Sequence, residues 1–428
     1  MSSELRMLWE HAGGQLPYDW EIVPLESFFR DAKSIAVGVM YPGPDTPGGT
    51  PLLKVGDIRD GAVLRPSYCI SAATDEEHRR TKLVGDELLI TLVGNPGECV
   101  VVTPEMAGWN PARAIAVIRL QDTSLRTYLK TVLESTAGRH LIDAVLNTTV
   151  QKTLNLKDIR KLPIPLPTDA EIKWISGISD ALTIRITLLR ETNATLEALA
   201  QALFKSWFVD FDPVRAKLEG RVPDGMDEAT AALFPDGFEE TELGLVPRGW
   251  KSVRLDTILE LAYGKALKAE QRKQGSVPVY GSGGITGWHD TALVSHPSVV
   301  VGRKGTVGSL FWESRPFFPI DTVFYAKSKL PLTYCFELLK TMGLSDMNTD
   351  AAVPGLNREN AYRLLVSDAP TGVVAAFDYV VRSVRQQIDH HAEQAQTLVT
   401  LRDTLLPRLI SGQLRLPEAK LQIKEDVE

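Results

Sequence analysis

Apolar residues recur at seven-residue spacing in two long stretches of the chain, residues 168–208 and 371–410. Two apolar sets interleaved in this way form a heptad pattern, which predicts a long helix with one apolar stripe. The first stretch carries Ile172, Ile175, Ser179, Leu182, Ile186, Leu189, Asn193, Leu196, Ala200 and Leu203. A shift of 202 positions gives Val374, Phe377, Val381, Val384, Ile388, His391, Ala395, Leu398, Arg402 and Leu405. The second stretch therefore repeats the first.

A helix with one apolar stripe must bury that stripe. We expect the two helices to pair antiparallel, because the residues between them leave room for a folded domain. The alternative is that each helix packs separately on its own domain. Asn193 at a seam position either fixes the register of the pair or is partly exposed, and His391 is more easily read as a tolerated core residue. The predicted interface consists of Ile175, Leu182, Ile186, Leu189, Leu196, Leu203, Phe377, Val384, Ile388, Leu398 and Leu405.

Short β-like runs broken by Gly, Pro and Asp precede each predicted helix. They lie at residues 51–55, 87–93, 98–103 and 114–120, and again at 277–280, 298–301, 308–312 and 321–326. Loose alternation with frequent turn residues predicts a curved mixed or antiparallel sheet in each half. Helical patches follow at residues 124–146 and 331–342.

Local motifs also recur between the two halves. Residues 16–25 and 246–255 share the pattern apolar-Pro-x-x-Trp-x-x-Val-x-Leu. Residues 93–97 match residues 301–305 in sequence, with Val-Gly at the start and Gly at the end. Asn155-Leu156 and Leu356-Asn357 mark similar places before each long helix. Such repetition indicates one unit of domain plus helix used twice.

Capping signals set the predicted helix ends. Thr168 and Glu171 form a capping-box pattern at the start of the first helix. Pro407 is expected to bend the second helix near its end, and Gly412 to terminate it. Residues 210–245, rich in turn signals and acidic side chains, are predicted to be a linker.

The net charge of −7 is unevenly distributed. Residues 168–245 carry 7 basic and 15 acidic side chains, whereas residues 246–370 carry 15 basic and 11 acidic ones. The two globular parts are thus near neutral or basic, which permits a DNA-facing surface. A hydrophobic content of 44%, three widely spaced cysteines and the lack of a long apolar run or signal peptide predict a globular cytoplasmic protein without disulfides or metal.

The glycine-rich stretch 281–287 looks at first like a cofactor-binding loop. Thr286 stands where G-x-G-x-x-G requires glycine, and no helix-forming run follows. Small donors here could approach a phosphate or a base edge instead, and a plain hairpin loop is the third alternative. We find no P-loop, H-E-x-x-H or G-x-S-x-G signature, so no catalytic residue is assigned.

Candidate DNA contacts come from polar and basic residues in turns. Arginine can bind guanine in a bidentate manner, and lysine can neutralise phosphate. In the second half they are Tyr280, Ser282, His289, Arg303, Lys304 and Thr306. In the first half they are Lys54, Arg59 and Asn95.

Several long stretches are similar to one known family. The similarity lies in residues 202–217, 242–250 and 401–412, together with residues 279–284 and 301–308. On these residues the chain resembles the DNA-specificity (S) subunit of type I restriction-modification systems, over nearly its whole length.

The resemblance implies an α+β fold with two mixed α/β target recognition domains in pseudo-twofold repeat, separated by two long helices that form an antiparallel coiled coil. The expected boundaries are 1–167, 168–209, 210–245, 246–370, 371–412 and 413–428, for domain, helix, linker, domain, helix and tail. Each domain would read one half of a split double-stranded DNA target. The chain would be non-catalytic and bind no cofactor, while methyltransferase (M) and restriction/motor (R) subunits would supply S-adenosylmethionine and ATP/Mg chemistry. The alternatives are a methyltransferase or nuclease in its own right, a coiled-coil scaffold that never touches DNA, and a solitary S-like protein without active partners.

Overall fold

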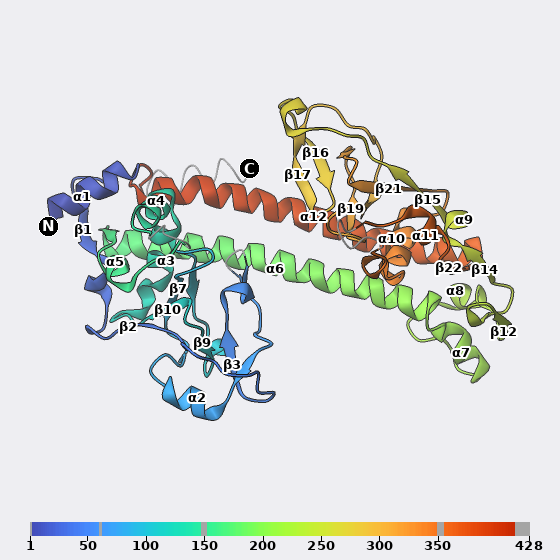
Figure 1. Ribbon diagram of the computed structural model, residues 1–428, viewed down its shortest axis with the longest axis horizontal. Coiled ribbons are helices and arrows are strands. Elements are labelled where there is room, and N and C mark those ends of the chain that lie inside the picture. The colour runs from blue at the N-terminus through green and yellow to red at the C-terminus, as the bar shows by residue number, and fades with distance from the viewer. Residues whose placement is uncertain (1, 60–61, 147–151, 349–354, 416–428) are drawn as a thin grey trace. The chain divides into compact units, whose positions relative to one another are not determined.

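The computed structural model describes residues 2–59, 62–146, 152–348 and 355–415 (Figure 1). The chain divides into two compact units: unit 1 is Met1–Leu188 with Gln394–Glu428, and unit 2 is Leu189–Glu393. Both long helices, α6 (Asp169–Phe208) and α12 (Thr371–Ile410), contribute residues to each unit.

Unit 1 combines short strands with helices. Its helices besides α6 and α12 are α1 (Ser2–His11), α2 (Ala72–Glu77), α3 (Arg126–Glu134), α4 (Thr136–Ala144) and α5 (Leu156–Arg160). Its strands are β1 (Glu21–Pro24), β2 (Ile35–Val37), β3 (Thr50–Leu53), β4 (Ile58–Arg59), β5 (Ala62–Val63), β6 (Cys69–Ile70), β7 (Leu88–Thr91), β8 (Cys99–Val101), β9 (Asn110–Pro111), β10 (Ile115–Ile118) and β11 (Pro163–Leu166).

Unit 2 has the same kind of composition. Its helices besides α6 and α12 are α7 (Asp212–Leu218), α8 (Glu228–Ala232), α9 (Leu255–Ile258), α10 (Leu332–Thr341) and α11 (Arg358–Tyr362). Its strands are β12 (Phe238–Thr241), β13 (Gly244–Pro247), β14 (Lys251–Arg254), β15 (Leu259–Tyr263), β16 (Val277–Gly281), β17 (Gly284–His289), β18 (Ser298–Gly302), β19 (Leu310–Glu313), β20 (Phe318–Pro319), β21 (Val323–Ser328) and β22 (Leu365–Asp368).

The sheets of the two units have matching topology. The four-stranded sheets have the orders β2-β10-β7-β8 and β15-β21-β18-β19, and both are antiparallel throughout. The three-stranded sheets β6-β3-β9 and β17-β16-β20 each contain one parallel pair, β3–β9 and β16–β20. Strand β1 pairs with β11 and β14 with β22, so each unit has a two-stranded ribbon whose second strand leads into a long helix. The predicted repeat and the mixed sheets are confirmed.

Equivalent residues make equivalent hydrogen bonds in the two units. The amide of Trp20 donates to the Pro17 carbonyl at 3.2 Å, and that of Trp250 donates to Pro247 at 3.0 Å. Both indole rings are buried, which explains the repeated Pro-x-x-Trp motif as a turn that inserts tryptophan into a core.

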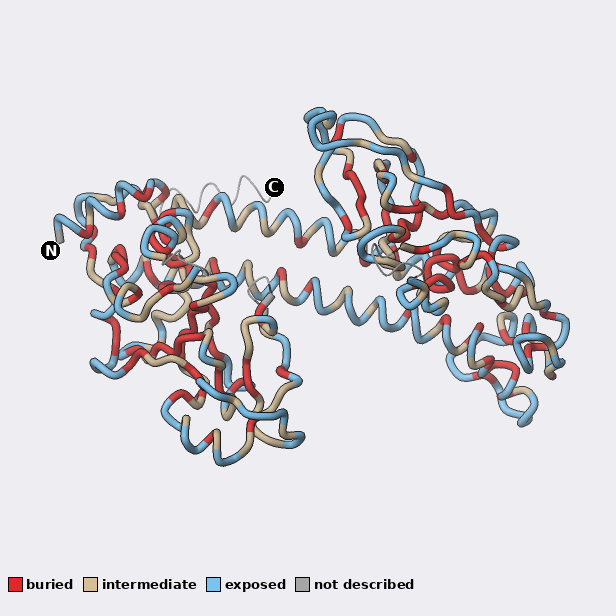
Figure 2. Tube along the Cα trace, viewed as in Figure 1, coloured by how far each residue is buried: buried red, intermediate tan, exposed pale blue. Residues whose placement is uncertain are grey.

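The long helices are paired in each unit as the heptads predict. In unit 1, Ile172 and Ile175 of α6 share a buried cluster with Leu405 and Leu409 of α12. In unit 2, Phe204 lies against Phe377 with ring centroids 5.6 Å apart. Six of the predicted interface residues are buried and the other five are half-buried. Along both long helices, buried and half-buried positions alternate with exposed ones (Figure 2).

Polar contacts between the helices show that they run antiparallel. The Asn193 amide donates to the carbonyl of Ile388 at 2.9 Å, and its oxygen lies 3.0 Å from His391 Nδ1. Asn193 comes before Phe204 in α6, whereas Ile388 and His391 come after Phe377 in α12. Asn193 and His391 are both half-buried and lie within hydrogen-bond distance of each other across the helix pair. This contact supports the alternative in which Asn193 fixes the register of the pair.

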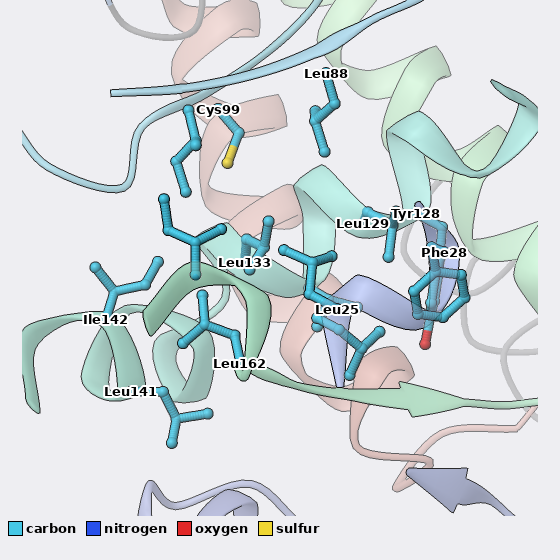
Figure 3. Packing of buried hydrophobic residues seen from close by; sticks show 14 of the residues in the cluster. Leu25, Phe28, Leu88, Cys99, Tyr128, Leu129, Leu133, Leu141, Ile142 and Leu162 are labelled. Atoms are coloured by element: carbon cyan, nitrogen blue, oxygen red, sulfur yellow. The ribbon is translucent and has the colours of Figure 1, made fainter. Parts of the chain in front are cut away.

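Each unit has its own core, and both long helices contribute residues to it. Figure 3 shows the unit 1 cluster, in which Leu25, Leu133 and Leu162 lie among mostly aliphatic neighbours and Tyr128 lies beside Phe28. In unit 2 the aromatic residues of α6 surround Phe377 and Tyr334, and Phe208 lies 5.0 Å from Tyr334 between ring centroids. The helices are therefore part of both cores, because their apolar stripes continue into residues of the sheets and short helices.

The predicted helix start is confirmed. The Thr168 amide donates to Glu171 Oε2 at 3.0 Å, and the Glu171 amide donates back to Thr168 Oγ1 at 3.4 Å. Helix α12 contains Pro407 within its last turn, and Gly412 follows it with a φ of +64°.

Among the alternatives for residues 281–287, the hairpin is the one that the structure contains: Gly281 pairs with Gly284, and residues 284–289 form strand β17, paired with β16 through a register shift at Val279 and Tyr280. The linker expected at residues 210–245 was wrong. Residues 210–245 are folded into unit 2 as α7, α8 and the β12–β13 hairpin. Phe211, Val214 and Phe234 are buried in the unit 2 core, so their apolar side chains outweigh the acidic, turn-rich composition.

Candidate nucleic-acid interface

Two glycine turns of unit 2 lie side by side. The first follows β16 at Ser282 and Gly283, and the second follows β18 at Lys304, Gly305 and Thr306. The Thr306 amide donates to Ser282 Oγ at 3.4 Å. Ser309 Oγ donates to the Ser282 carbonyl at 2.5 Å and to the Thr306 carbonyl at 3.0 Å. Three of the predicted contact residues are thus brought together on what we call the turn surface of unit 2.

The glycines make this close approach possible. Gly305 has a φ of +88°, and a Cβ there would stand 3.1 Å from Ser282 Oγ. A larger residue would push the two turns apart and would also strain the backbone. Gly283, Lys304, Gly305 and Thr306 are exposed, and Ser282 is half-buried.

Unit 1 has an equivalent turn surface, formed by Lys54, Val55, Gly56, Gly94 and Asn95. A Cβ on Gly94, whose φ is +86°, would stand 3.5 Å from Val55 Cγ1. In unit 2, a Cβ on Gly305 would approach Ser282 in the same way. The bridge Val93–Thr153 in unit 1 matches the bridge Lys304–Gly355 in unit 2. Two of the predicted contact residues, Lys54 and Asn95, therefore lie on the matching surface.

The register between the two halves differs from the predicted one. The amide of Gly97 donates to the Thr91 carbonyl at 2.8 Å, and that of Gly308 donates to Gly302 at 2.9 Å. This aligns residues 93–97 with residues 304–308 rather than with 301–305. Asn95 is consequently the counterpart of Thr306. The sequence comparison was wrong by three positions because it matched the letters Val-Gly instead of the turn that follows the strand.

Lysine and asparagine on the unit 1 surface are held by neighbours. Lys54 Nζ lies 3.4 Å from the centroid of the Tyr68 ring. Asn95 is exposed, and its amide nitrogen donates to Glu98 Oε2 at 3.1 Å. Arg59 is in strand β4, but its side chain falls outside the described residues.

Two further candidates, Tyr280 and His289, point into unit 2. Tyr280 is buried and its hydroxyl donates to Glu313 Oε2 at 3.0 Å, and burial raises the pKa of this phenol above its ordinary range. His289 is buried, and its Nδ1 accepts from the Lys273 amide at 3.1 Å. In this conformation neither side chain can reach a base, so both shape the sheet beneath the turn surface.

Arg303 lies beside the turn surface rather than on it. Its guanidinium carbon is 4.9 Å from the centroid of Tyr263, and Nη1 donates to the Asp321 carbonyl at 3.1 Å. Arg358 approaches the same tyrosine ring at 4.7 Å. Tyr263 and Arg358 were not predicted, because they are distant from Arg303 in sequence and carry no motif.

Within the described ranges, no group of three or more His, Cys, Asp or Glu side chains could hold a metal ion. None of the helices in the described part of the chain is both long and apolar enough to cross a membrane. The turn surfaces offer amide, hydroxyl and ammonium donors, which suit phosphate oxygens and base edges.

No family model matches the chain. The type I restriction enzyme EcoBI specificity subunit of Escherichia coli is 29% identical over 198 residues, which are 44% of this chain and 42% of that protein. The HindI specificity subunit of Haemophilus influenzae is 24% identical over 352 residues, covering 67% of this chain and 74% of that protein. The first match thus spans less than half of the relative's length.

The fold has a counterpart among solved structures. The type I restriction-modification S subunit from M. genitalium matches with a TM-score of 0.57 and 18% identity, covering 92% of this chain and 97% of that chain. The resemblance found in the sequence is confirmed: the chain is similar in sequence to type I restriction enzyme specificity subunits and has the fold of the M. genitalium S subunit. The predicted α+β class with an antiparallel helix pair is confirmed with it.

Proposed function

We propose that the chain is the DNA-recognition subunit of a type I restriction-modification complex. Each unit would read one half of a split double-stranded target through its turn surface. The observation that carries this proposal is the duplicated turn surface, built at matching topological positions on two units that share the fold of specificity subunits.

The two turn surfaces present different chemistry. At matching positions unit 1 has Asn95 where unit 2 has Thr306. Asparagine suits the N6/N7 edge of adenine, whereas threonine bonds to several bases or contacts the thymine methyl group. Two readers of one fold with different side chains are expected to recognise two different half-sites.

Catalysis belongs, in this proposal, to other subunits. The named relatives are specificity subunits, and we infer that this chain selects DNA without modifying it. Methyltransferase subunits would bind S-adenosylmethionine, and restriction/motor subunits would use ATP and Mg, all in the cytoplasm. The long helices carry exposed apolar residues in each unit, Ile184 in unit 1 and Leu199 and Tyr379 in unit 2, and we infer that residues of this kind contact such partners.

The first test is to sequence methylated bases in cells that express this chain with its methyltransferase partners. We expect one bipartite motif with an unread gap, which disappears when this chain is deleted. Methylation that persists without the chain would contradict the proposal, and so would the scaffold outcome, in which the complex assembles but binds no DNA.

A reciprocal exchange assigns each half of the motif. Asn95→Thr should alter only one half-site, and Thr306→Asn should alter only the other, because each side chain sits on its own unit. A lost bidentate base contact costs about 1–3 kcal/mol of discrimination. Arg254→Leu, an exposed substitution beside Asp256, serves as the control that should leave both halves unchanged. If both exchanges alter the same half, or neither, the turn surfaces are not the readers.

A further inference from the structure

Unit 2 carries a cationic cluster where unit 1 is aliphatic. The amide of Leu154 donates to the Leu92 carbonyl at 2.9 Å, and that of Leu356 donates to Arg303 at 2.8 Å. Leu92 and Arg303 are therefore equivalent. Leu156 and Arg358 are the first residues of α5 and α11, each following an asparagine.

Tyr263 also has an aliphatic counterpart. The glycines that follow Val37 and Tyr263 approach backbone in the same manner: a Cβ on Gly38 would stand 2.0 Å from the Pro111 carbonyl, and one on Gly264 would stand 2.1 Å from that of Ile320. Val37, Leu92 and Leu156 all belong to the apolar cluster of unit 1. The same place in the fold is thus filled by aliphatic side chains in one unit and by Tyr263, Arg303 and Arg358 in the other.

Both guanidinium groups contact the Tyr263 ring and have little compensating charge. Each carbon lies within 5 Å of the ring centroid, at 4.9 and 4.7 Å, so the two charges are separated by no more than about one Debye length. Within the described residues, Arg303 has no carboxylate within 4.0 Å, and Arg358 has only Glu359 at 3.7 Å, whose side chain is 63% exposed. A stable core did not require these charges, as the aliphatic version in unit 1 demonstrates.

Most hydrogen-bond donors of the two arginine side chains have no acceptor among the described residues. A guanidinium group has five N–H donors. Among the described residues, Arg303 donates one hydrogen bond, to the Asp321 carbonyl, and Arg358 Nε is buried without a hydrogen-bond partner. Tyr263 is 48% exposed, so the cluster reaches the surface. Paired arginines with free donors fit the oxygens of a phosphodiester group.

We propose that Tyr263, Arg303 and Arg358 form a DNA-backbone contact that unit 2 has and unit 1 lacks. The two arginines neutralise phosphate charge beside the half-site read by the turn surface of unit 2, and Tyr263 holds them in place. This inference rests on the proposed function. It assigns the cluster to sequence-independent affinity and the neighbouring turn surface to base choice.

The test grafts the unit 1 chemistry onto unit 2. The triple variant Tyr263→Val, Arg303→Leu, Arg358→Leu places there the residue types that pack in unit 1. Binding of the complex with its methyltransferase partners is measured on specific and unrelated duplexes across a salt series. One phosphate contact contributes about 0.9 to the logarithmic salt slope and roughly tenfold in affinity at about 0.1 M salt. We expect the slope to fall by about 2 and the affinity to fall roughly a hundredfold on both duplexes.

Two controls accompany the graft. Arg358→Gln keeps a polar, though shorter, side chain and removes one charge, so it should lower the slope by about 1 even if the triple variant folds poorly. Arg254→Leu removes one exposed charge elsewhere on unit 2 and should leave the slope unchanged.

The outcomes separate this inference from the proposed function. An unchanged slope in both Arg358→Gln and the folded triple variant means that the cluster has a structural role only, which overturns the inference. Loss of discrimination between the two duplexes at an unchanged slope overturns it as well, since the arginines would then read bases. If the unaltered complex does not bind the duplex that it methylates more tightly than the unrelated duplex, the proposed function itself has failed.

Discussion

Unit 1 and unit 2 attach a helix of the domain to a long helix by different chemistry. In unit 1, α3 meets α6 through hydroxyl donors: Thr131 Oγ1 donates to Ser179 Oγ at 2.9 Å, and Thr127 Oγ1 donates to Asp180 Oδ1 at 2.9 Å. In unit 2, Thr333 of α10 likewise donates to Asp378 of α12 at 2.6 Å, but Arg385 of α12 also donates to Glu337 of α10 at 2.7 Å, and both of these side chains are buried. Unit 2 therefore adds a buried ion pair to a hydroxyl contact without changing the order of its strands.

The two units share the glycines that the fold requires and differ in the side chains that each adds. Gly38 and Gly264 recur because a Cβ would collide with a backbone carbonyl, and Gly94 and Gly305 recur because both have a positive φ. Side chains at other matching positions differ, as Leu92 and Arg303 do. Backbone constraints are thus shared by both units, whereas the chemistry available to a ligand is specific to each.

The buried ion pair of unit 2 should show the largest difference between the units. Arg385→Ala leaves the Glu337 carboxylate buried without its main partner, and we expect a loss of about 3–5 kcal/mol of unfolding free energy. Urea unfolding measures this, with the fluorescence of Trp312, whose ring lies 5.6 Å from the Arg385 guanidinium, as a local signal. The double variant Arg385→Leu, Glu337→Leu should be near neutral or more stable. An equal loss in the double variant would show that packing, not charge, holds α10 to α12.

The shared glycines should respond alike. Gly38→Ala and Gly264→Ala each place a methyl group against a backbone carbonyl, and each is expected to cost about 1–3 kcal/mol. Thermal unfolding of the two single variants measures the effect, and Gly56→Ala, where a Cβ meets nothing within 4 Å, is the matched control. A tolerated change in one unit only would break the equivalence inferred for these positions.

The hydroxyl contact of unit 1 should matter less than the ion pair of unit 2. Thr131→Val removes the donor to Ser179 while retaining the shape of the side chain, and about 1 kcal/mol is expected. The same urea titration applies. A cost as large as that of Arg385→Ala would mean that the two attachments are energetically equivalent despite their chemistry.

Two aspartates should give small pH effects of opposite sign. For Asp75 in unit 1, burial would raise the pKa, but hydrogen bonds from Lys82 and Asn110 outweigh it and hold the pKa below 3.8. Its stabilisation is present above the unfolded pKa and is lost as pH falls through the lowered folded value. For Asp389 in unit 2, burial raises the pKa, so the ionised group destabilises the fold at neutral pH and acidification relieves that cost.

Asparagine variants test the signs. At pH 7, Asp75→Asn should lower the unfolding midpoint, and Asp389→Asn should raise it. Repeating both at pH 4 should shrink the Asp389 effect, because the native group is then increasingly protonated. Two variants that shift the midpoint in the same direction at pH 7 would refute the assignment.

Much of the fold could be predicted because it repeats in the sequence. The heptads, the Pro-x-x-Trp turns and the capping box at Thr168 each depend on local spacing, and the structure contains all three. The three-residue error in matching residues 93–97 could not be avoided in the same way. A Val-Gly pair occurs at both sites, and only the ladder hydrogen bonds show where each strand ends.

The candidate site was predicted less completely. Ser282, Lys304, Thr306, Lys54 and Asn95 were chosen as polar turn residues, and the structure places them on the turn surfaces. Tyr280 and His289 have equally suitable side chains but point inward, since alternation along a bulged strand cannot be read from residue types. Tyr263 and Arg358 became candidates only after strand pairing joined distant segments.

The divided sequence of unit 1 has a consequence for biosynthesis. Residues 394–415 supply Leu405 and Leu409 to the same cluster as Leu25 and Tyr128, so the ribosome must first translate all of unit 2. At about 5–20 residues per second that delay is on the order of 10–40 s. During this interval the nascent polypeptide exposes an incomplete apolar cluster, which makes it a natural client for chaperones that bind emerging chains.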